Sequence, residues 1–309
     1  MRILFCTKKD ILGASILNWM LPRLQEHQVK VLLSDKTRAE ENSVQALVQE
    51  KFLERDLPLR VLFPLIDKQS TTGALATFEG CRQRYQVEID VIERINDPDT
   101  EAMIRDWAPD IILSARFSLI FKANIERIPP LGIFNIHPGA LPGYAGLYAP
   151  LRAVLNADAQ LGCTLHQVDE GIDTGAVYSV SYLPFTSERS VFGHLTQLYE
   201  LGLASFLALL AELKRGDTPH LQVQDKALFK YFRLPEEAAF VSLKALGVDL
   251  VAFDVYSSFI KQFVPKDFIP QLQAELSVQA LEQATQQVNS VGIDNVVANF
   301  NERLKKFSR

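Results

Sequence analysis

The chain has 309 residues, of which 48% are hydrophobic and 22% charged, so it is long enough for two domains and has the composition of a globular protein. Its net charge of −5 argues against a polyanionic nucleic acid as the main ligand, because such binders usually carry a basic surface. No segment reaches the roughly 20 apolar residues that span a bilayer, and the N-terminus has no signal-peptide pattern. We therefore expect a cytoplasmic protein that does not contact membranes.

Apolar runs of strand length alternate with helical periodicities over the first 215 residues. The predicted strands cover residues 2–6, 29–33, 59–66, 88–92, 110–114, 131–137, 162–168 and 176–182. The predicted helices cover residues 11–24, 37–54, 98–107, 148–156 and 190–214. This alternation predicts an α/β fold with a doubly wound, mostly parallel sheet, in which ligands bind beyond the carboxyl ends of the strands.

The pattern changes near Arg215, which we take as the boundary between a domain of residues 1–215 and a C-terminal region of residues 216–309. We predict that this region is smaller and mainly helical, with a short strand at 221–224 and a long helix at 269–289. It would serve for the formation of a homodimer or as a lid over a substrate, and the sequence leaves both open.

Two polar segments follow predicted strands and carry residues suited to acyl chemistry. Asn135 and His137 are two residues apart at a strand end, so their side chains point to the same side. An amide donor beside an imidazole can stabilise an oxyanion and move a proton. Asp173 lies between Gly171 and Gly175, which let the backbone approach a ligand closely. A lone His at a strand end is more often structural, and an Asp between glycines is usually a turn residue. Their common place at strand ends of one sheet nevertheless favours a site.

The segments FNIHPGALPGYAGLYAP and GCTLHQVDEGIDTGAV resemble the formyltransferase family that uses 10-formyltetrahydrofolate. That family includes glycinamide ribonucleotide, methionyl-tRNA and amino-sugar formyltransferases. Its pattern is N-x-H, then LP-x-Y-x-G, then D-x-x-x-D-x-G. The matching residues here are Asn135, His137, Leu141, Pro142, Tyr144, Gly146, Asp169, Asp173 and Gly175. The resemblance covers roughly residues 1–215 and implies a Rossmann-like formyltransferase fold and a catalytic domain over this range.

The resemblance also implies roles for the matching residues. Asn135 would bind the formyl oxygen and stabilise the oxyanion, His137 would donate a hydrogen bond and carry a proton, and Asp173 would hold His137 and relay the proton through water. The folate would lie against Arg116, Phe117, Leu119, Ile120 and Phe121 and the loop residues Asp169, Glu170, Gly171 and Ile172. Core packing is the alternative for Leu119 and Phe121, and a local carboxylate partner is the alternative for Arg116.

Four further residues are candidates for binding the substrate, namely Lys8, Lys9, Tyr144 and His166. Solvated surface positions are the alternative for the two lysines, and His166 is expected at the strand surface near the site. No metal is implied, because the five histidines and three cysteines show no ligand spacing.

The acceptor is expected to be the amine of a small metabolite, such as a nucleotide-linked amino sugar or an amino-acid derivative. Gly143 and Ala145 stand where many relatives carry basic residues, and the C-terminal region lacks a five-stranded barrel pattern, so tRNA is disfavoured. The alternatives are a methionyl-tRNA formyltransferase, a formyltetrahydrofolate hydrolase and a catalytically silent binding protein. The hydrolases carry an N-terminal regulatory domain, whereas the strand pattern here begins at Arg2, which favours a transferase.

Overall fold

The computed structural model describes residues 1–307. These residues form two compact units. The first comprises residues 1–8, 19–36 and 88–250, and the second comprises residues 9–18, 37–87 and those from 251 onward. Helix α1, Ile11–Met20, has residues in both units. The division at residue 215 that the sequence suggests concerns function and stays a prediction.

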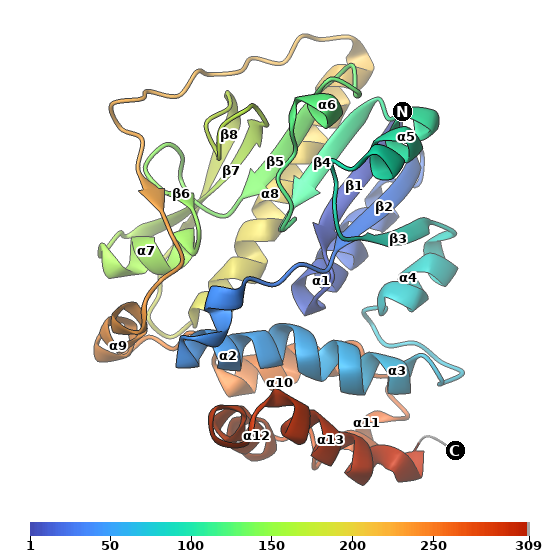
Figure 1. Ribbon diagram of the computed structural model, residues 1–309, viewed down its shortest axis with the longest axis vertical. Helices are drawn as coiled ribbons and strands as arrows, with labels where there is room; N and C mark the ends of the chain where they lie inside the picture. Colours follow the sequence, from blue (N-terminus) through green and yellow to red (C-terminus); the bar gives the residue numbers. More distant parts are fainter. Residues whose placement is uncertain (308–309) are drawn as a thin grey trace. The chain divides into compact units, whose positions relative to one another are not determined.

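A seven-stranded sheet in the order β3-β2-β1-β4-β5-β7-β8 forms the centre of the first unit (Figure 1). Its strands are β1 Arg2–Lys8, β2 Gln28–Ser34, β3 Glu88–Ile92, β4 Ile111–Ala115, β5 Ile133–His137, β7 Gln160–Gln167 and β8 Val177–Pro184. The strands β3, β2, β1, β4 and β5 pair in parallel, whereas β7 and β8 are antiparallel to their neighbours. The structure therefore confirms the α/β fold with a mostly parallel sheet.

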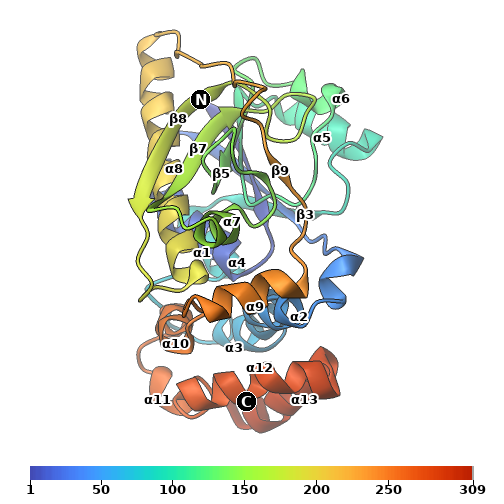
Figure 2. The same ribbon diagram turned by 90° about the vertical axis from the view of Figure 1, so that its left-hand side faces the viewer.

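Helices cover both faces of this sheet, as a doubly wound fold requires. Leu4 and Ile112 point to one face, where they pack with Ile104 of α5, Pro98–Trp107, and Ile125 of α6, Ala123–Glu126. Helix α5 begins as the sequence predicts, because the Asp97 carboxylate accepts hydrogen bonds from the backbone of its first turn and Pro98 follows. The opposite face of β5, β7 and β8 is covered by α8, Val191–Arg215 (Figure 2).

An extended segment of residues 217–233, which we call the strap, follows α8 (Figure 1). Gly216 ends α8 in the left-handed conformation that glycine favours. The strap ends in β9, Tyr231–Phe232, which pairs in parallel with β6, Ala145–Gly146. The predicted strand at 221–224 is wrong, because only an isolated bridge between Gln222 and Val177 forms there. The remaining helices of this unit are η1 Leu21–Arg23, α7 Ala149–Leu155 and α9 Glu237–Ala245.

The second unit is helical in its described part. Its helices are η2 Ala39–Asn42, α2 Gln45–Lys51, η3 Phe52–Asp56, η4 Pro58–Leu62, α3 Phe63–Ile66, α4 Phe78–Tyr85, α10 Phe253–Lys261, α11 Ile269–Leu272, α12 Val278–Val291, α13 Ile293–Leu304 and η5 Lys305–Phe307. The C-terminal region is thus mainly helical, as predicted. The helical pattern predicted at 269–289 corresponds to two helices, α11 and α12, because Ser277 caps the second one with its hydroxyl.

The predicted strand at 59–66 is wrong, since this segment continues a helical run that begins at Gln45. Its buried residues Leu57, Val61 and Leu65 are spaced four apart and so lie on one helical face. A short apolar run is compatible with a buried strand or a buried helix, and here packing within the helical unit selects the helix. Within residues 1–307, no helix is both long and apolar enough to cross a membrane.

Candidate active site

Asn135 and His137 lie at the carboxyl end of β5, where the sheet changes from parallel to antiparallel pairing. Ile136 between them packs under the sheet against α8, since a Cβ atom on Gly202 would lie 2.3 Å from its Cγ2. Side chains alternate along a strand, so Asn135 and His137 point away from α8. On β7, His166 lies opposite Asn135.

Four polar side chains meet at this point. Nδ2 of Asn135 lies 3.1 Å from Nε2 of His166. The carboxylate of Asp173 places Oδ2 3.5 Å from Nδ1 of His137 and Oδ1 3.6 Å from Nε2 of His166. The structure thus brings the three candidate catalytic residues together and adds His166 as a fourth. The expected surface position of His166 is wrong, because its side chain is only 3% exposed.

The hydrogen bonds define where the protons of His137 lie. Its Nε2 is 2.6 Å from the backbone carbonyl oxygen of Tyr144. A carbonyl oxygen only accepts hydrogen bonds, so Nε2 carries a hydrogen. Nδ1 faces the Asp173 carboxylate, whose Oδ2 is 3.5 Å away. The pair can therefore take up a proton and hold it between the ring and the carboxylate.

His166 orients the amide of Asn135. Nδ1 of His166 lies 2.9 Å from the carbonyl oxygen of Gln167 and therefore carries a hydrogen. In the neutral ring, Nε2 then accepts a hydrogen bond from the Asn135 amide. An amide has two N–H donors, so the second remains for the oxygen of a ligand.

Asp173 is held by backbone groups as well as by the imidazoles. Its φ of +56° lies in the left-handed region, and its Oδ2 accepts a hydrogen bond of 2.8 Å from the Gly146 amide. Burial by itself raises the pKa of Asp173, but its interactions with the imidazoles of His137 and His166 and with the Gly146 amide outweigh it. The pKa therefore lies well below its ordinary value, and Asp173 is a carboxylate at neutral pH.

The residues expected around the folate lie on two loops. Arg116 directly follows β4 with a φ of +59°. Phe117 and Phe121 stack with ring centroids 5.4 Å apart, and Phe121 is buried in the core between the sheet and α5. Ile120, in contrast, is 61% exposed. The side chain of Phe121 therefore packs in the core, which is the alternative that the sequence left open, and only its backbone can meet a ligand.

The loop after β7 is shaped by its own side chains. Oδ1 of Asp169 accepts hydrogen bonds from the Gly171 amide at 3.1 Å and from the Thr174 hydroxyl at 2.6 Å. Glu170 and Ile172 are exposed, with Ile172 at 45%. This arrangement leaves Ile172 as an apolar side chain at the surface of the loop that carries Asp173.

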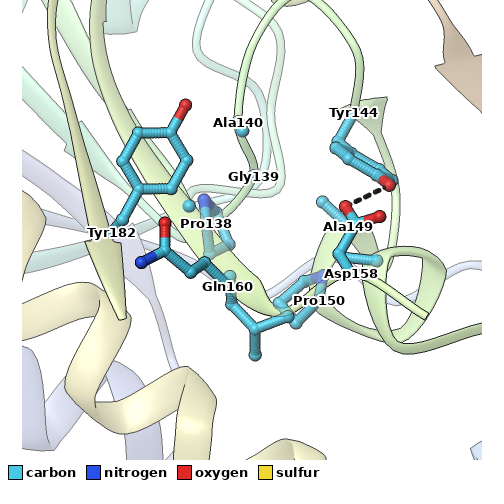
Figure 3. Close-up of a pocket in the computed structure, with 12 residues that line it drawn as sticks. Pro138, Gly139, Ala140, Tyr144, Ala149, Pro150, Asp158, Gln160 and Tyr182 are labelled. Atoms are coloured by element: carbon cyan, nitrogen blue, oxygen red, sulfur yellow. Dashed lines mark hydrogen bonds between the residues drawn. The ribbon is translucent and has the colours of Figure 1, made fainter. Parts of the chain in front are cut away.

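The residues expected to bind substrate do not all join the cluster. Lys8 ends β1, which is separated from β5 by β4, and Lys9 follows it. Tyr144 contributes its carbonyl to His137, while its hydroxyl donates to Asp158 at 2.5 Å (Figure 3). Burial and the Asp158 carboxylate raise the pKa of Tyr144 to about 12.

The side chain of Tyr144 borders a cavity of about 190 Å³ beside the loop after β5 (Figure 3). Its lining residues are Pro138, Gly139, Ala140, Tyr144, Ala149, Pro150, Ala153, Asp158, Gln160, Leu161, Gly162 and Tyr182. None of the four clustered side chains lines this cavity. Among residues 1–307, no group of three or more His, Cys, Asp or Glu side chains is arranged to hold a metal ion.

Two contributors to the site were not named from the sequence as functional residues. The Gly146 amide binds the Asp173 carboxylate, and the Gln224 side chain binds the backbone on either side of Thr174. Gly146 had a signal, since it is part of the LP-x-Y-x-G pattern. Gln224 had none, because it lies 51 residues from Asp173 in a segment with no motif.

The chain is similar to known formyltransferases in sequence and in fold. The family model described as formyl transferase matches residues 82–199. A methionyl-tRNA formyltransferase from Nitrosococcus oceani is 28% identical over 198 residues, which cover 62% of this chain and 61% of that protein. The chain thus spans about three-fifths of the length of this relative.

Two solved structures share the fold. Glycinamide ribonucleotide transformylase 1 from Symbiobacterium toebii has a TM-score of 0.51 at 16% identity and covers 73% of this chain and 94% of that one. A 4-N formyltransferase from Francisella tularensis has a TM-score of 0.51 at 14% identity and covers 77% of each chain. At these identities the likeness concerns the fold alone. The match over residues 82–199 confirms the resemblance inferred from the two motifs, and these residues, which include Asn135, His137 and Asp173, form a domain of the formyl transferase family.

Proposed function

We propose that this protein transfers the formyl group of 10-formyltetrahydrofolate to the amine of a small metabolite. The observation that carries the proposal is the cluster at the carboxyl end of β5, where Asp173 lies beside His137 and His166, and His166 in turn lies beside Asn135, all within the matched domain. In such a transfer the acceptor nitrogen attacks the formyl carbon, N10 of the folate leaves, and one proton moves from the acceptor to N10. The products are a formamide and tetrahydrofolate, so no enzyme nucleophile is needed.

The cluster supplies the two elements that this reaction requires. The free N–H of Asn135 is placed to donate to the formyl oxygen as it becomes an oxyanion, which typically accelerates a reaction by about 10²–10³-fold. The His137–Asp173 pair takes the proton that the amine loses, since the carboxylate stabilises the charged ring. His166 keeps the Asn135 amide in orientation through its Nε2 atom.

The folate is proposed to lie between the loop after β4 and the loop after β7. Exposed apolar side chains on each, Ile120 and Ile172, would contact its pteridine ring, and Arg116, Phe117, Leu119, Phe121, Asp169, Glu170 and Gly171 would shape the two loops around it. This arrangement agrees with the rule that ligands of such sheets bind beyond the carboxyl ends of the strands.

The acceptor is proposed to be small and to carry an anionic group. Ala145 is fully buried, so this position offers no side chain to a phosphate backbone. The strap presents Lys226, Lys230 and Arg233, which are exposed and make no ion pair within residues 1–307. Three such cations on one strap, two of them flanking the strand β9 that pairs with β6, suit a substrate with one or two phosphates, as a nucleotide-linked amino sugar has. The sequence similarity to methionyl-tRNA formyltransferases makes tRNA the second candidate.

The test measures tetrahydrofolate release and product mass with 10-formyltetrahydrofolate and a panel of acceptors. The panel contains nucleotide-linked amino sugars, amino acids, hydroxylated amino-acid derivatives and methionyl-tRNA. We expect turnover with a small amine, and a decrease of about 100-fold or more in Asn135→Ala and Asp173→Asn. Asp106→Asn, on the exposed side of α5, is the control with unchanged activity.

The other outcomes identify the alternatives. Turnover with methionyl-tRNA alone would show that the acceptor class is wrong. Tetrahydrofolate release without any amine would identify a hydrolase, and the absence of both turnover and folate binding would refute a catalytic role.

A further inference from the structure

The strap holds both loops that carry the site. Lys230 donates its amide hydrogen to the Pro142 carbonyl at 3.0 Å, and its carbonyl accepts from Ala145 at 2.9 Å. Further on, the Phe232 carbonyl accepts from Leu147 at 2.9 Å. These bonds fix the loop after β5 on both sides of Gly146, whose amide binds the Asp173 carboxylate. The strap lies outside the segment that matches the family model.

Gln224 fixes the second loop from the same strap. Its Nε2 donates to the carbonyl oxygen of Asp173 at 2.8 Å and to that of Gly175 at 2.7 Å. Both hydrogens of the amide are therefore used on the two residues that flank Thr174. Gly175 allows this tight turn, since a Cβ atom there would lie 1.8 Å from the Gln167 carbonyl oxygen. The backbone of Asp173 is thus held by Gln224, while its carboxylate is held by Gly146.

The left-handed backbone conformation of Asp173 depends on contacts such as the hydrogen bond from Gln224. Its φ of +56° is a backbone conformation that residues other than glycine adopt only when their surroundings enforce it. If the loop relaxed to a negative φ, the direction from Cα to the carboxylate would change. The carboxylate would then leave its place 3.5 Å from Nδ1 of His137 and 3.6 Å from Nε2 of His166.

We propose that Gln224 is a positioning residue for formyl transfer, and that its amide keeps Asp173 against the two imidazoles through the backbone. The inference rests on the proposed function and adds to it a residue of the strap, which lies outside the matched domain. Gln224 does not touch the reacting atoms. Its effect falls on the rate of the chemical step, while the binding of the folate is left intact.

The test compares Gln224→Met, which keeps the length of the side chain and removes both donors, with Gln224→Lys, whose ammonium can again donate to two carbonyls. We expect kcat to fall about 10- to 100-fold in Gln224→Met, since displacements of about 1 Å cost this much. KM for the folate should change less than about threefold, and Gln224→Lys should recover part of the lost rate. Gln222→Met is the matched control, because the Gln222 side chain is exposed on the same strap.

A second readout is independent of turnover. In protein labelled with ¹³C at aspartate carboxyl groups, the pKa of Asp173 should rise toward its ordinary value in Gln224→Met and stay low in Gln222→Met. Wild-type kcat and an unchanged Asp173 titration in Gln224→Met would overturn the inference, as would an equal loss in Gln222→Met. If the wild-type protein transfers no formyl group, the proposed function fails, whereas the titration still tests the contact.

Discussion

The packing of α8 beneath the site leads to a prediction about Gly202. A Cβ atom at this position would lie 2.3 Å from Cγ2 of Ile136 and 2.9 Å from Sγ of Cys163, whereas ordinary contact begins at 3.4 Å. Substitution by alanine thus requires β5 and α8 to separate by about 1 Å. The gain in helix propensity of about 1 kcal/mol is offset by an overpacking cost of about 1–3 kcal/mol. We expect the free energy of unfolding to fall by up to about 2 kcal/mol.

The effect on activity should exceed the effect on stability. Ile136 lies between Asn135 and His137, so any movement of β5 carries both side chains with it. A misplacement of about 1 Å can lower a rate by about 100-fold, and we expect kcat of Gly202→Ala to fall by about 10- to 100-fold. Urea denaturation and steady-state kinetics measure the two effects. Gly193→Ala is the control in the first turn of the same helix, where the new methyl group meets the side chain of Arg189. Wild-type kcat in Gly202→Ala, at equal or higher stability, would refute the reasoning.

Three further predictions concern stability and the assignment of side chains. Burial, together with the charge of Arg189, lowers the pKa of His194, so the unfolded chain binds this proton first. The contribution of His194 to the free energy of unfolding should therefore be fully present above the ordinary pKa of 6.5 and be lost as the pH falls below it. Thermal unfolding between about pH 7 and 5 measures this loss, and the decrease of stability with falling pH should be smaller in His194→Phe. Tyr144→Phe removes the hydrogen bond that the hydroxyl donates to Asp158 and the one that it accepts from Asn156. Because neither bond reaches the His137 cluster, kcat should change less than about threefold, while about 1 kcal/mol of stability is lost in urea. Tyr256→Phe leaves the Leu53 carbonyl without the hydroxyl that donates to it at 2.5 Å, and the free energy of unfolding should fall by about 1–3 kcal/mol. A smaller decrease would show that water replaces the hydroxyl.

The sequence predicted the centre of the sheet well because β1, β4 and β5 are mostly buried apolar runs. The predicted strand 131–137 also placed Asn135 and His137 on one side, since a period of two residues decides this without knowledge of the partners. The strand prediction for residues 59–66 was wrong because the pattern there does not decide between a strand and a helix. Its apolar residues satisfy both periods over so short a stretch, and only the neighbouring helices determine which one forms.

The site was predictable where its chemistry is local. The glycines beside Asp173 point to it, since Gly175 is required by the close approach to the Gln167 backbone and Gly171 by the close approach to the Thr174 side chain. The contacts of His166 and Gln224 depend instead on strand register and on the path of the strap. The antiparallel register of β5 and β7 places His166 opposite Asn135, and the sequence of two strands does not show which of their residues pair. For this reason the sequence alone indicates neither the buried position of His166 nor the role of Gln224.

One stretch of chain supports the site from two directions. Helix α8 supports β5 from below through Gly202, and the strap that follows it holds Asp173 through Gln224. The two contacts act on different members of the cluster, since the first places Asn135 and His137 and the second places Asp173. Asp173 meets His137 only when both the helix contact and the strap contact are made. Once one contact is lost, losing the other therefore costs less, and the double substitution at Gly202 and Gln224 should lower kcat by less than the product of the two single effects. A fully multiplicative loss would show that the helix and the strap act on independent steps.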